Sequence, residues 1–397
     1  MIINLFAFLF VISFLALGWT FFGYPFAMFI ASRIAPRAIR RDLNLTPSMT
    51  LLIPAYNEAD VIRVKLENSI SLNYPSEKLQ ILVIDDGSND KTAAIVSEFE
   101  DRGVTLIRQP MRSGKMNAVN RGFNEATGEI VVLSDASPSY ERDSLHKLIS
   151  PFADTSVGVV VGTLALWDAK NAVAKSAGIY WKYEAALRKW ESQTGSTVAV
   201  HGNMFAVRRS LYRPLRTTTI NDEFSIAMEV MRQGYRVVYE PTAISYDMAS
   251  TNMNDEFKRR ARINAGRYQA LLSTGYLKGP TLDLTFRLFS HKLLRPLAPL
   301  FLISLFFGNL LVVLLAEPTG SPLGPVQGIW KFLLAGQVAF YGVAALGLAA
   351  EKQGLHNRIL TVPYFFVSSN FAALVGLWRW LRDKQRVTWQ KRAGDNQ

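Results

Sequence analysis

The sequence of 397 residues contains no cysteine, which excludes disulfides, thiolate catalysis and thiolate-bound metal sites. It also lacks internal repeats and low-complexity tracts. No basic residue precedes the first apolar run, which begins at Ile2, whereas a secretory signal carries basic residues ahead of its apolar segment. We therefore interpret this first run as an uncleaved membrane anchor.

Four long apolar runs stand out in a chain whose apolar fraction is 49%. Runs of this length can cross a bilayer core about 30 Å thick. They cover Ile2 to Ile30, Leu293 to Leu315, Phe332 to Ala350 and Ile359 to Leu377. The sequence therefore predicts the following segments: an N-terminal transmembrane anchor (1–32), a soluble domain (33–250), amphipathic interfacial helices (251–292), a C-terminal transmembrane region (293–381) and a basic tail (382–397).

Basic residues beside the apolar runs indicate how the chain is oriented. Four arginines follow the anchor between positions 33 and 41, and such residues stay on the cytoplasmic side. We therefore expect an integral protein of the plasma (inner) membrane with a cytoplasmic soluble domain. The loop 317–327 has no basic residue and should lie outside. Four complete spans would also place the basic tail outside, so either the run 359–377 is tilted or re-entrant, or the first run does not cross fully; we expect a cytoplasmic tail.

The net charge of +12 is compatible with nucleic acid or with anionic lipid. Much of the excess lies beside the apolar runs, where lipid headgroups explain it more simply. We therefore expect membrane lipid as a partner and no nucleic acid. The segment 255–272 reads as a basic amphipathic helix, which suits a headgroup surface or an anionic ligand.

Strands and helices alternate in the first half of the soluble domain. Short apolar strands are predicted at Thr50–Ile53, Leu79–Ile84, Val104–Ile107 and Ile130–Leu133, with helical periodicity between them. The alternation predicts an α/β domain with a mostly parallel sheet. The second half alternates less regularly, with helices expected at 170–190 and 222–232 and a strand at 237–239.

Three acidic clusters lie at or after the ends of predicted strands: Asp85-Asp86, Asp135 and Asp222-Glu223. Carboxylates that converge on one crevice repel each other unless a cation lies among them. Mg²⁺ or Mn²⁺, held by carboxylates and substrate phosphates, is the natural companion. Lys115 follows a glycine turn before a helix, where an anion can bind. These groups together fit a sugar nucleotide.

The span 51–269 resembles the family 2 glycosyltransferases of GT-A (Rossmann-like) fold, in the membrane-embedded branch that includes hyaluronan, chitin, cellulose and poly-N-acetylglucosamine synthases. The motifs that carry the resemblance are Pro54-Ala55-Tyr56-Asn57-Glu58, Asp85-Asp86-Gly87-Ser88, Gly114-Lys115, Asp135-Ala136-Ser137, Asn221-Asp222-Glu223 and Arg259-Arg260-Ala261-Arg262-Ile263.

The resemblance implies a role for each motif. Residues binding the nucleotide-sugar would be Pro54, Tyr56, Glu58, Asp85, Asp86, Lys115, Asp135 and Arg262, with Asp86 contacting the base and ribose. Asp135 and Ser137 would bind Mg²⁺ or Mn²⁺. Glu223 or Asp222 would be the general base. The acceptor would approach His201, Gly202 and Asn203, because a glycine allows close approach of a ligand.

Two motifs depart from the family pattern and keep alternatives open. Serine replaces the second metal-binding aspartate at Ser137, and Ile263 replaces the tryptophan of the Gln-x-x-Arg-Trp motif. The leading hypothesis is an inverting transferase that moves a sugar from a UDP-sugar to a growing polysaccharide or lipid-linked acceptor with a β-linkage, with export or assembly partners. The alternatives are transfer of a single sugar to a lipid-linked acceptor, and an inactive membrane scaffold that retains the fold.

Overall fold

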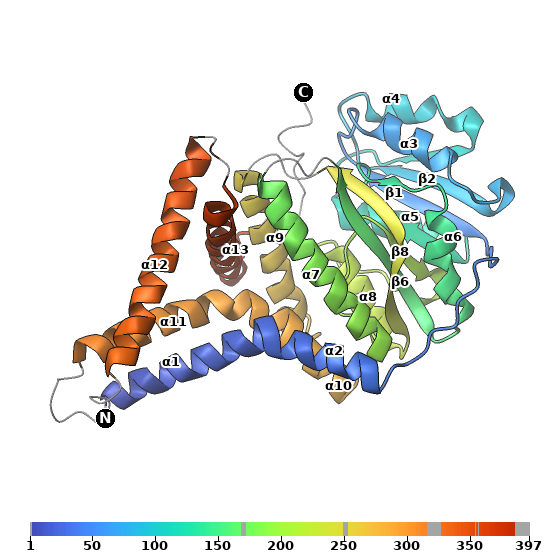
Figure 1. Ribbon diagram of the computed structural model, residues 1–397. Coiled ribbons are helices and arrows are strands. Elements are labelled where there is room, and N and C mark those ends of the chain that lie inside the picture. Colours follow the sequence, from blue (N-terminus) through green and yellow to red (C-terminus); the bar gives the residue numbers. More distant parts are fainter. Residues whose placement is uncertain are drawn as a thin grey trace.

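The structure, a computed structural model, describes residues 2–167, 172–248, 253–315, 327–353, 355 and 357–385. An α/β domain lies beside a group of long apolar helices (Figure 1). Most of the loop 317–327 and the basic tail beyond residue 385 lie outside the described residues. The two predicted parts of the chain, one globular and one apolar, are therefore both present.

One eight-stranded sheet forms the centre of the α/β domain. Its order is β3-β2-β1-β4-β7-β6-β8-β5, with β7 antiparallel to β4 and β6, and β5 antiparallel to β8. The remaining pairs are parallel, which confirms the predicted mostly parallel sheet. The strands are β1 (Met49–Ala55), β2 (Leu79–Asp85), β3 (Val104–Arg108), β4 (Ile130–Leu133), β5 (Ser139–Tyr140), β6 (Val157–Trp167), β7 (Phe205–Arg208) and β8 (Arg236–Met248).

Helices cover both faces of this sheet and continue into the long apolar group. They are α1 (Ile2–Gly18), α2 (Tyr24–Ile34), α3 (Ile62–Ile70), α4 (Thr92–Ser97), α5 (Lys115–Glu125), α6 (Ser144–Ile149), α7 (Ala172–Thr194), α8 (Asp222–Arg232), α9 (Met253–Tyr268), α10 (Leu282–Arg287), α11 (Leu294–Leu315), α12 (Gln327–Lys352) and α13 (Arg358–Leu381). Helix α8 has the predicted bounds, whereas β8 extends well beyond the predicted 237–239.

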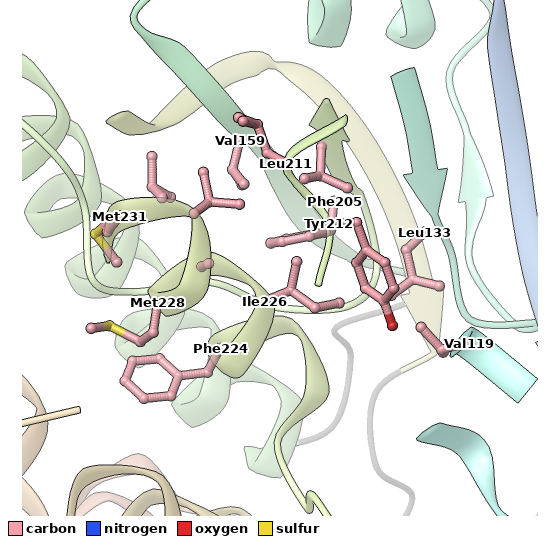
Figure 2. Close-up of a cluster of buried hydrophobic side chains, with 14 of the residues drawn as sticks. Val119, Leu133, Val159, Phe205, Leu211, Tyr212, Phe224, Ile226, Met228 and Met231 are labelled. Atoms are coloured by element: carbon pink, nitrogen blue, oxygen red, sulfur yellow. The ribbon is translucent and has the colours of Figure 1, made fainter. Parts of the chain in front are cut away.

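Side chains of the central strands alternate between two buried cores, as a sheet buried on both faces requires. In β1, Leu52 belongs to one core, while Leu51 and Ile53 belong to the other. Figure 2 shows part of the first core, where Ile226 of α8 lies on the side of Tyr212 and Phe205, while Met228 lies beside Phe224 on another side of the helix. This packing fixes α8, and therefore the acids at its start, relative to the sheet.

The first strand runs through Pro54 instead of ending before it, which corrects the sequence prediction. The carbonyl of Leu52 accepts a hydrogen bond from Ser134 N at 3.0 Å. The backbone N–H and C=O groups of the even-numbered residues of β1 therefore point toward β4. Pairing with β4 stops at the Leu52–Leu133 pair. An N–H at Pro54 would point toward β4, where the pairing has already ended. Proline therefore loses no hydrogen bond of the sheet at this position.

In the part of the chain that the structure describes, four helical stretches are long and apolar enough to cross a membrane: Ile2–Ile34, Leu282–Leu315, Gln327–Lys352 and Ile359–Leu381. The first joins α1 and α2 through a π-helical turn at Trp19–Gly23. The second begins at Leu282, earlier than the predicted Leu293. Helices α1 and α11 pack closely, since Gly308 lies against the backbone of Phe6. These exposed apolar surfaces suit a lipid environment.

Helix α13 lies along α9 for most of its length (Figure 1). The ring of Phe371 lies tilted against that of Phe257, with ring centroids 5.8 Å apart. Further along both helices, Gly376 lies so close to α9 that a Cβ there would be 2.7 Å from the carbonyl of Ala261. The indole of Trp380 then donates to Ser273 at 3.1 Å. The end of α13 therefore lies beside the end of α9, next to the α/β domain.

Candidate active site

Lys115 is the centre of the candidate site. Its Nζ lies 2.8 Å from Asp135 Oδ1, 3.0 Å from Asp222 Oδ2 and 3.0 Å from Glu223 Oε1. Lys115 is the first residue of α5, and Gly114 before it has φ +96°, a conformation that favours glycine. Three of the acids singled out in the sequence thus surround one lysine, an arrangement that the sequence did not predict.

The start of α8 supplies two of these acids. Asp222 and Glu223 are the first two residues of the helix, where its dipole favours negative charge. The preceding residue, Asn221, donates from Nδ2 to the carbonyl of Ile263 in α9 at 2.9 Å. The core of Figure 2 holds the apolar face of α8. Both carboxylates are thus fixed by packing on one side and by α9 on the other.

The surroundings of Asp222 and Glu223 shift their pKa values in opposite directions. Burial, and next the charge of Asp222, raises the pKa of Glu223 to about 8, although Lys115 acts in the opposite direction. Burial alone would raise the pKa of Asp222, but the charge of Lys115 together with hydrogen bonds to the carboxylate lowers it. Burial alone would lower the pKa of Lys115, but the three carboxylates hold it well above its usual value. Lys115 and Asp222 are therefore the charged pair, and Glu223 is the group suited to proton transfer near neutral pH.

Gly202 forms the surface beneath the carboxylates. A Cβ at this position would lie 2.0 Å from Glu223 Oε1 and 3.4 Å from Asp135 Oδ2. The predicted close approach at Gly202 is therefore made by the two acidic side chains in this structure. Any side chain at position 202 would displace the carboxylate of Glu223.

We expect Gly202→Ala to lower sugar transfer by about 10²-fold, because a displacement of about 1 Å of a reacting group has effects of that size. Initial transfer rates on purified protein measure the effect. Gly336→Ala is the matched control, since a Cβ there meets nothing within 4 Å. Wild-type activity in Gly202→Ala would show that Glu223 does not need its present position.

The other two residues of the predicted acceptor segment form hydrogen bonds with groups other than these three carboxylates. Asn203 donates from Nδ2 to Asp247 Oδ2 at 2.9 Å, and its carbonyl accepts from Tyr140. The ring of His201 lies with its Nε2 3.0 Å from the carbonyl of Gly162. Of the three residues, Gly202 alone is placed against the acids.

Asp86 and Asp85 organise the neighbouring turn. Asp86 accepts from the backbone N–H groups of Ser113 at 2.7 Å and Gly114 at 2.8 Å. Asp85 accepts from Ser88 N at 3.2 Å and lies 3.5 Å from Nε of Arg108. Asp86 therefore connects the end of β2 directly to the turn that carries Lys115. Both acids are completely buried.

The first predicted motif lies on the same edge of the sheet. The guanidinium of Arg112 lies 3.9 Å from the ring centroid of Tyr56, a cation–π contact. The backbone N–H of Glu58 donates to Thr92 at 2.8 Å, and Pro54 pairs with Ile84 near the end of the β1–β2 ladder. Tyr56 and Arg112 together form a flat, cationic surface at this edge, on which a planar ring can stack.

Arg262 lies on α9, next in sequence to Ile263, whose carbonyl binds Asn221. It is half-buried, and no ion pair to it occurs among the described residues. Its neighbours Arg259 and Arg260 instead pair with Glu256 at 3.3 and 2.6 Å. Arg260 also lies 4.6 Å from the ring centroid of Phe365 in α13. Arg262 is thus the arginine of this motif that remains available near the start of α8.

A buried polar network that the sequence did not predict lies between α7 and the membrane helices. Glu191 accepts from Tyr24 at 2.6 Å and lies 2.7 Å from Nδ1 of His291. Its other oxygen accepts from Thr197 Oγ1 at 2.8 Å and from Val198 N at 3.2 Å. The network thereby fixes the segment that leads to Gly202. The residues of this network are far apart in the sequence, so no local sequence pattern indicates it.

Comparisons with known proteins show which family and fold the chain resembles. The profile of Glycosyl transferase family 2 matches residues 50–216. A "Probable glycosyltransferase YdaM" of Bacillus subtilis (strain 168) is 27% identical over 247 residues, covering 59% of this chain and 58% of that protein. A "Poly-beta-1,6-N-acetyl-D-glucosamine synthase" of Staphylococcus aureus (strain MSSA476) is 26% identical over 250 residues, covering 59% of this chain and 60% of that protein. The match thus spans less than two thirds of these relatives.

A solved structure extends the likeness over nearly the whole chain. It is that of the "Mannosyltransferase PcManGT from Pyrobaculum calidifontis in complex with GDP-Man and Mn2+". The TM-score is 0.72 at 23% identity, with 95% of this chain and 99% of that chain covered. At this identity the likeness establishes the fold. Residues 50–216 are therefore similar to glycosyltransferase family 2, and the chain has a GT-A-like α/β domain with long apolar helices at its N- and C-terminal ends.

Proposed function

We propose that the protein transfers a sugar from a nucleoside-diphosphate sugar to an acceptor at the membrane surface, with inversion at the sugar C1. The observation that carries the proposal is the arrangement of Lys115 among Asp135, Asp222 and Glu223, directly above Gly202. It combines a carboxyl group suited to proton transfer with a fixed cation for a charged leaving group.

The donor would lie along the edge formed by Tyr56, Arg112 and the turn that Asp86 binds. Its diphosphate would reach Lys115 and Arg262. A UDP-sugar is our proposed donor, and the N-acetylglucosamine polymer in the name of the Staphylococcus relative makes an N-acetylhexosamine the first sugar to test. GDP-sugars belong in the same panel, because the structural relative from Pyrobaculum is in complex with GDP-Man.

In the reaction, an acceptor oxygen attacks C1 as Glu223 takes its proton. The bond between C1 and the diphosphate oxygen breaks, and the nucleoside diphosphate leaves with the electron pair. Lys115 stabilises the charge that develops on this leaving group. Because attack occurs opposite the leaving group, an α-linked donor gives a β-linked product. Asp222 keeps Lys115 charged and in place.

Asp135 and Ser137 could supply part of the ligand set of a divalent cation. The side chain of Asp135 is 42% exposed although one oxygen binds Lys115, and Ser137 is a half-buried neutral oxygen ligand two residues further on. Mg²⁺ needs only one or two carboxylates when substrate phosphates supply further oxygens. When bound, Mg²⁺ or Mn²⁺ would neutralise diphosphate charge. Asp135, with Ser137, would hold it.

A panel of labelled nucleotide-sugars, incubated with protein-containing membranes and Mg²⁺ or Mn²⁺, tests the function. We expect label from one donor to enter a lipid-extractable or polymeric product, and a chelator to prevent this. Product size separates polysaccharide synthesis from single-sugar transfer, which the absence of an aromatic ring at Ile263 favours. Failure with every donor, together with no donor hydrolysis, would support an inactive scaffold instead.

We further propose that the α/β domain faces the cytoplasm from the plasma (inner) membrane, with α13 lying against the domain instead of crossing fully. The contacts of α13 with α9, up to Trp380 and Ser273, support this position. It resolves the conflict between four spans and a basic tail, because three crossings return the chain to the domain's side.

The absence of native cysteine makes this topology directly testable. We expect a single cysteine at Gln385 to react with an impermeant maleimide from the same side of the membrane as one at Asp101 in the α/β domain. A cysteine at Gly328, at the start of α12, should react from the opposite side. Labelling of inverted and right-side-out vesicles measures this. If the cysteine at position 385 reacted from the same side as the one at position 328, α13 would cross the membrane.

A further inference from the structure

Arg188, in the C-terminal third of α7, is a buried cation that has no charge partner in the described part of the chain. Only 4% of its surface is exposed, its Nε has no hydrogen bond, and no carboxylate pairs with it among the described residues. The guanidinium lies 5.4 Å from the ring centroid of Trp181 and 6.0 Å from that of Tyr239. Because an unpaired buried charge is strongly unfavourable, a group of this kind points to an anionic ligand.

His201 adds a second unpartnered group to the same cluster. Its ring lies 6.2 Å from that of Trp181, and Nε2 is 3.0 Å from the carbonyl of Gly162. Nε2 therefore carries the proton and donates, which leaves the buried Nδ1 as an acceptor with no donor. Burial and the charge of Arg188 hold the pKa of His201 well below its usual value, so the ring is neutral. A ligand carrying both an anion and a hydroxyl would satisfy both residues.

The long apolar helices α2 and α13 contact residues of α7 close to this cluster. On α7, Leu187 packs against Tyr24 and Met28 of α2, next to Arg188 in sequence. Trp181 packs against Phe365 of α13. Helix α7 itself lies between the sheet and the long apolar helices (Figure 1). A ligand bound at Arg188 therefore has apolar membrane segments beside it.

The cluster also adjoins the reacting groups. His201 precedes Gly202, which contacts the carboxylate of Glu223. A ligand at Arg188 and His201 therefore approaches the proposed base from the membrane side, whereas Tyr56 and Arg112 lie at the nucleotide edge. This is the position that an acceptor needs.

We propose that Arg188 binds a phosphate group of a lipid-linked acceptor and that Nδ1 of His201 accepts a hydrogen bond from a hydroxyl of that acceptor. The proposal rests on the proposed transferase function, because it names the class of acceptor for the same site. A free phosphate would offer Arg188 the same chemistry without the lipid, so the test compares the two sources.

Binding of dodecyl phosphate to the purified full-length protein in dodecyl maltoside micelles, without any donor, tests the proposal. We expect Arg188→Met to weaken this binding at least about 10-fold, since charge-assisted hydrogen bonds are lost. Arg188→Lys should retain part of it. Lys189→Met, an exposed neighbour on α7 with the same loss of charge, is the matched control and should bind as the wild type does. Dodecyl glucoside should show no dependence on Arg188.

Stability separates binding from a structural role. Because Arg188 is unpaired, we expect Arg188→Met to keep or raise the melting temperature without ligand, whereas loss of a structural arginine lowers it. Unchanged dodecyl phosphate binding in Arg188→Met would overturn the proposal. Inorganic phosphate binding as tightly as dodecyl phosphate would overturn the lipid assignment. Since no donor is present, these results do not depend on whether sugar transfer is observed.

Discussion

Glu223→Gln is expected to lower sugar transfer by about 10²- to 10⁴-fold, the usual contribution of a general base, while donor binding is retained. Glutamine preserves the size of the side chain and its contact with Lys115, but it cannot accept the acceptor proton. Burial and Asp222 raise the pKa of Glu223 to about 8, so this carboxylate is a stronger base than an ordinary glutamate. Initial rates with the best donor, and equilibrium dialysis of the labelled nucleotide, measure the two effects separately.

Glu229→Gln is the matched control for this prediction. Glu229 lies on the same helix, where it accepts from Tyr276 at 2.7 Å, and glutamine retains a carbonyl for that bond. Its rate should remain near that of the wild type. Full activity in Glu223→Gln together with loss in Asp222→Asn would instead assign the base to Asp222.

Lys115→Met is expected to lower transfer by about 10²- to 10³-fold, as observed when one fixed donor to a developing charge is removed. The ammonium has two roles in our account: it keeps three carboxylates together, and it stabilises the leaving diphosphate. Methionine fills a similar volume but leaves Asp135, Asp222 and Glu223 without their shared cation. The turnover number and the donor affinity should therefore both fall.

Arg121→Met provides the comparison for Lys115→Met. Arg121 is on the same helix, is 55% exposed and pairs with Glu125 one turn later, so its loss should have little effect on rate or stability. Transfer by Lys115→Met at the wild-type rate would show that the lysine is a structural counter-ion only.

The elements with strong local patterns were predictable from the sequence. Strand β4 and helix α8 have the predicted bounds, because each is a periodic apolar stretch with clear ends. Strand β6, at Val157–Trp167, was not predicted, and β8 was predicted too short. Strand β8 continues past Pro241 because it pairs again with β6 after a register shift, and such long-range pairing leaves no local signal.

The candidate site was predictable in its residue types but not in its connections. Strand ends and the family motifs indicated Asp135, Asp222 and Glu223, and a glycine turn indicated Lys115. That Lys115 forms ion pairs with all three depends on tertiary distances, such as that between the starts of α5 and α8. Arg188 gave no signal, because its burial and lack of a partner arise only in the folded protein.

The configuration of the newly formed glycosidic bond tests the central claim most directly, which is single displacement at C1 with Glu223 as the base. The measurement is proton NMR of the product formed by the purified protein from an α-linked nucleotide-sugar. Our account predicts that the wild type forms a β-linked product and that the Glu223→Gln variant does not. An α-linked product would contradict single displacement, and an undiminished yield from Glu223→Gln would contradict the role of Glu223.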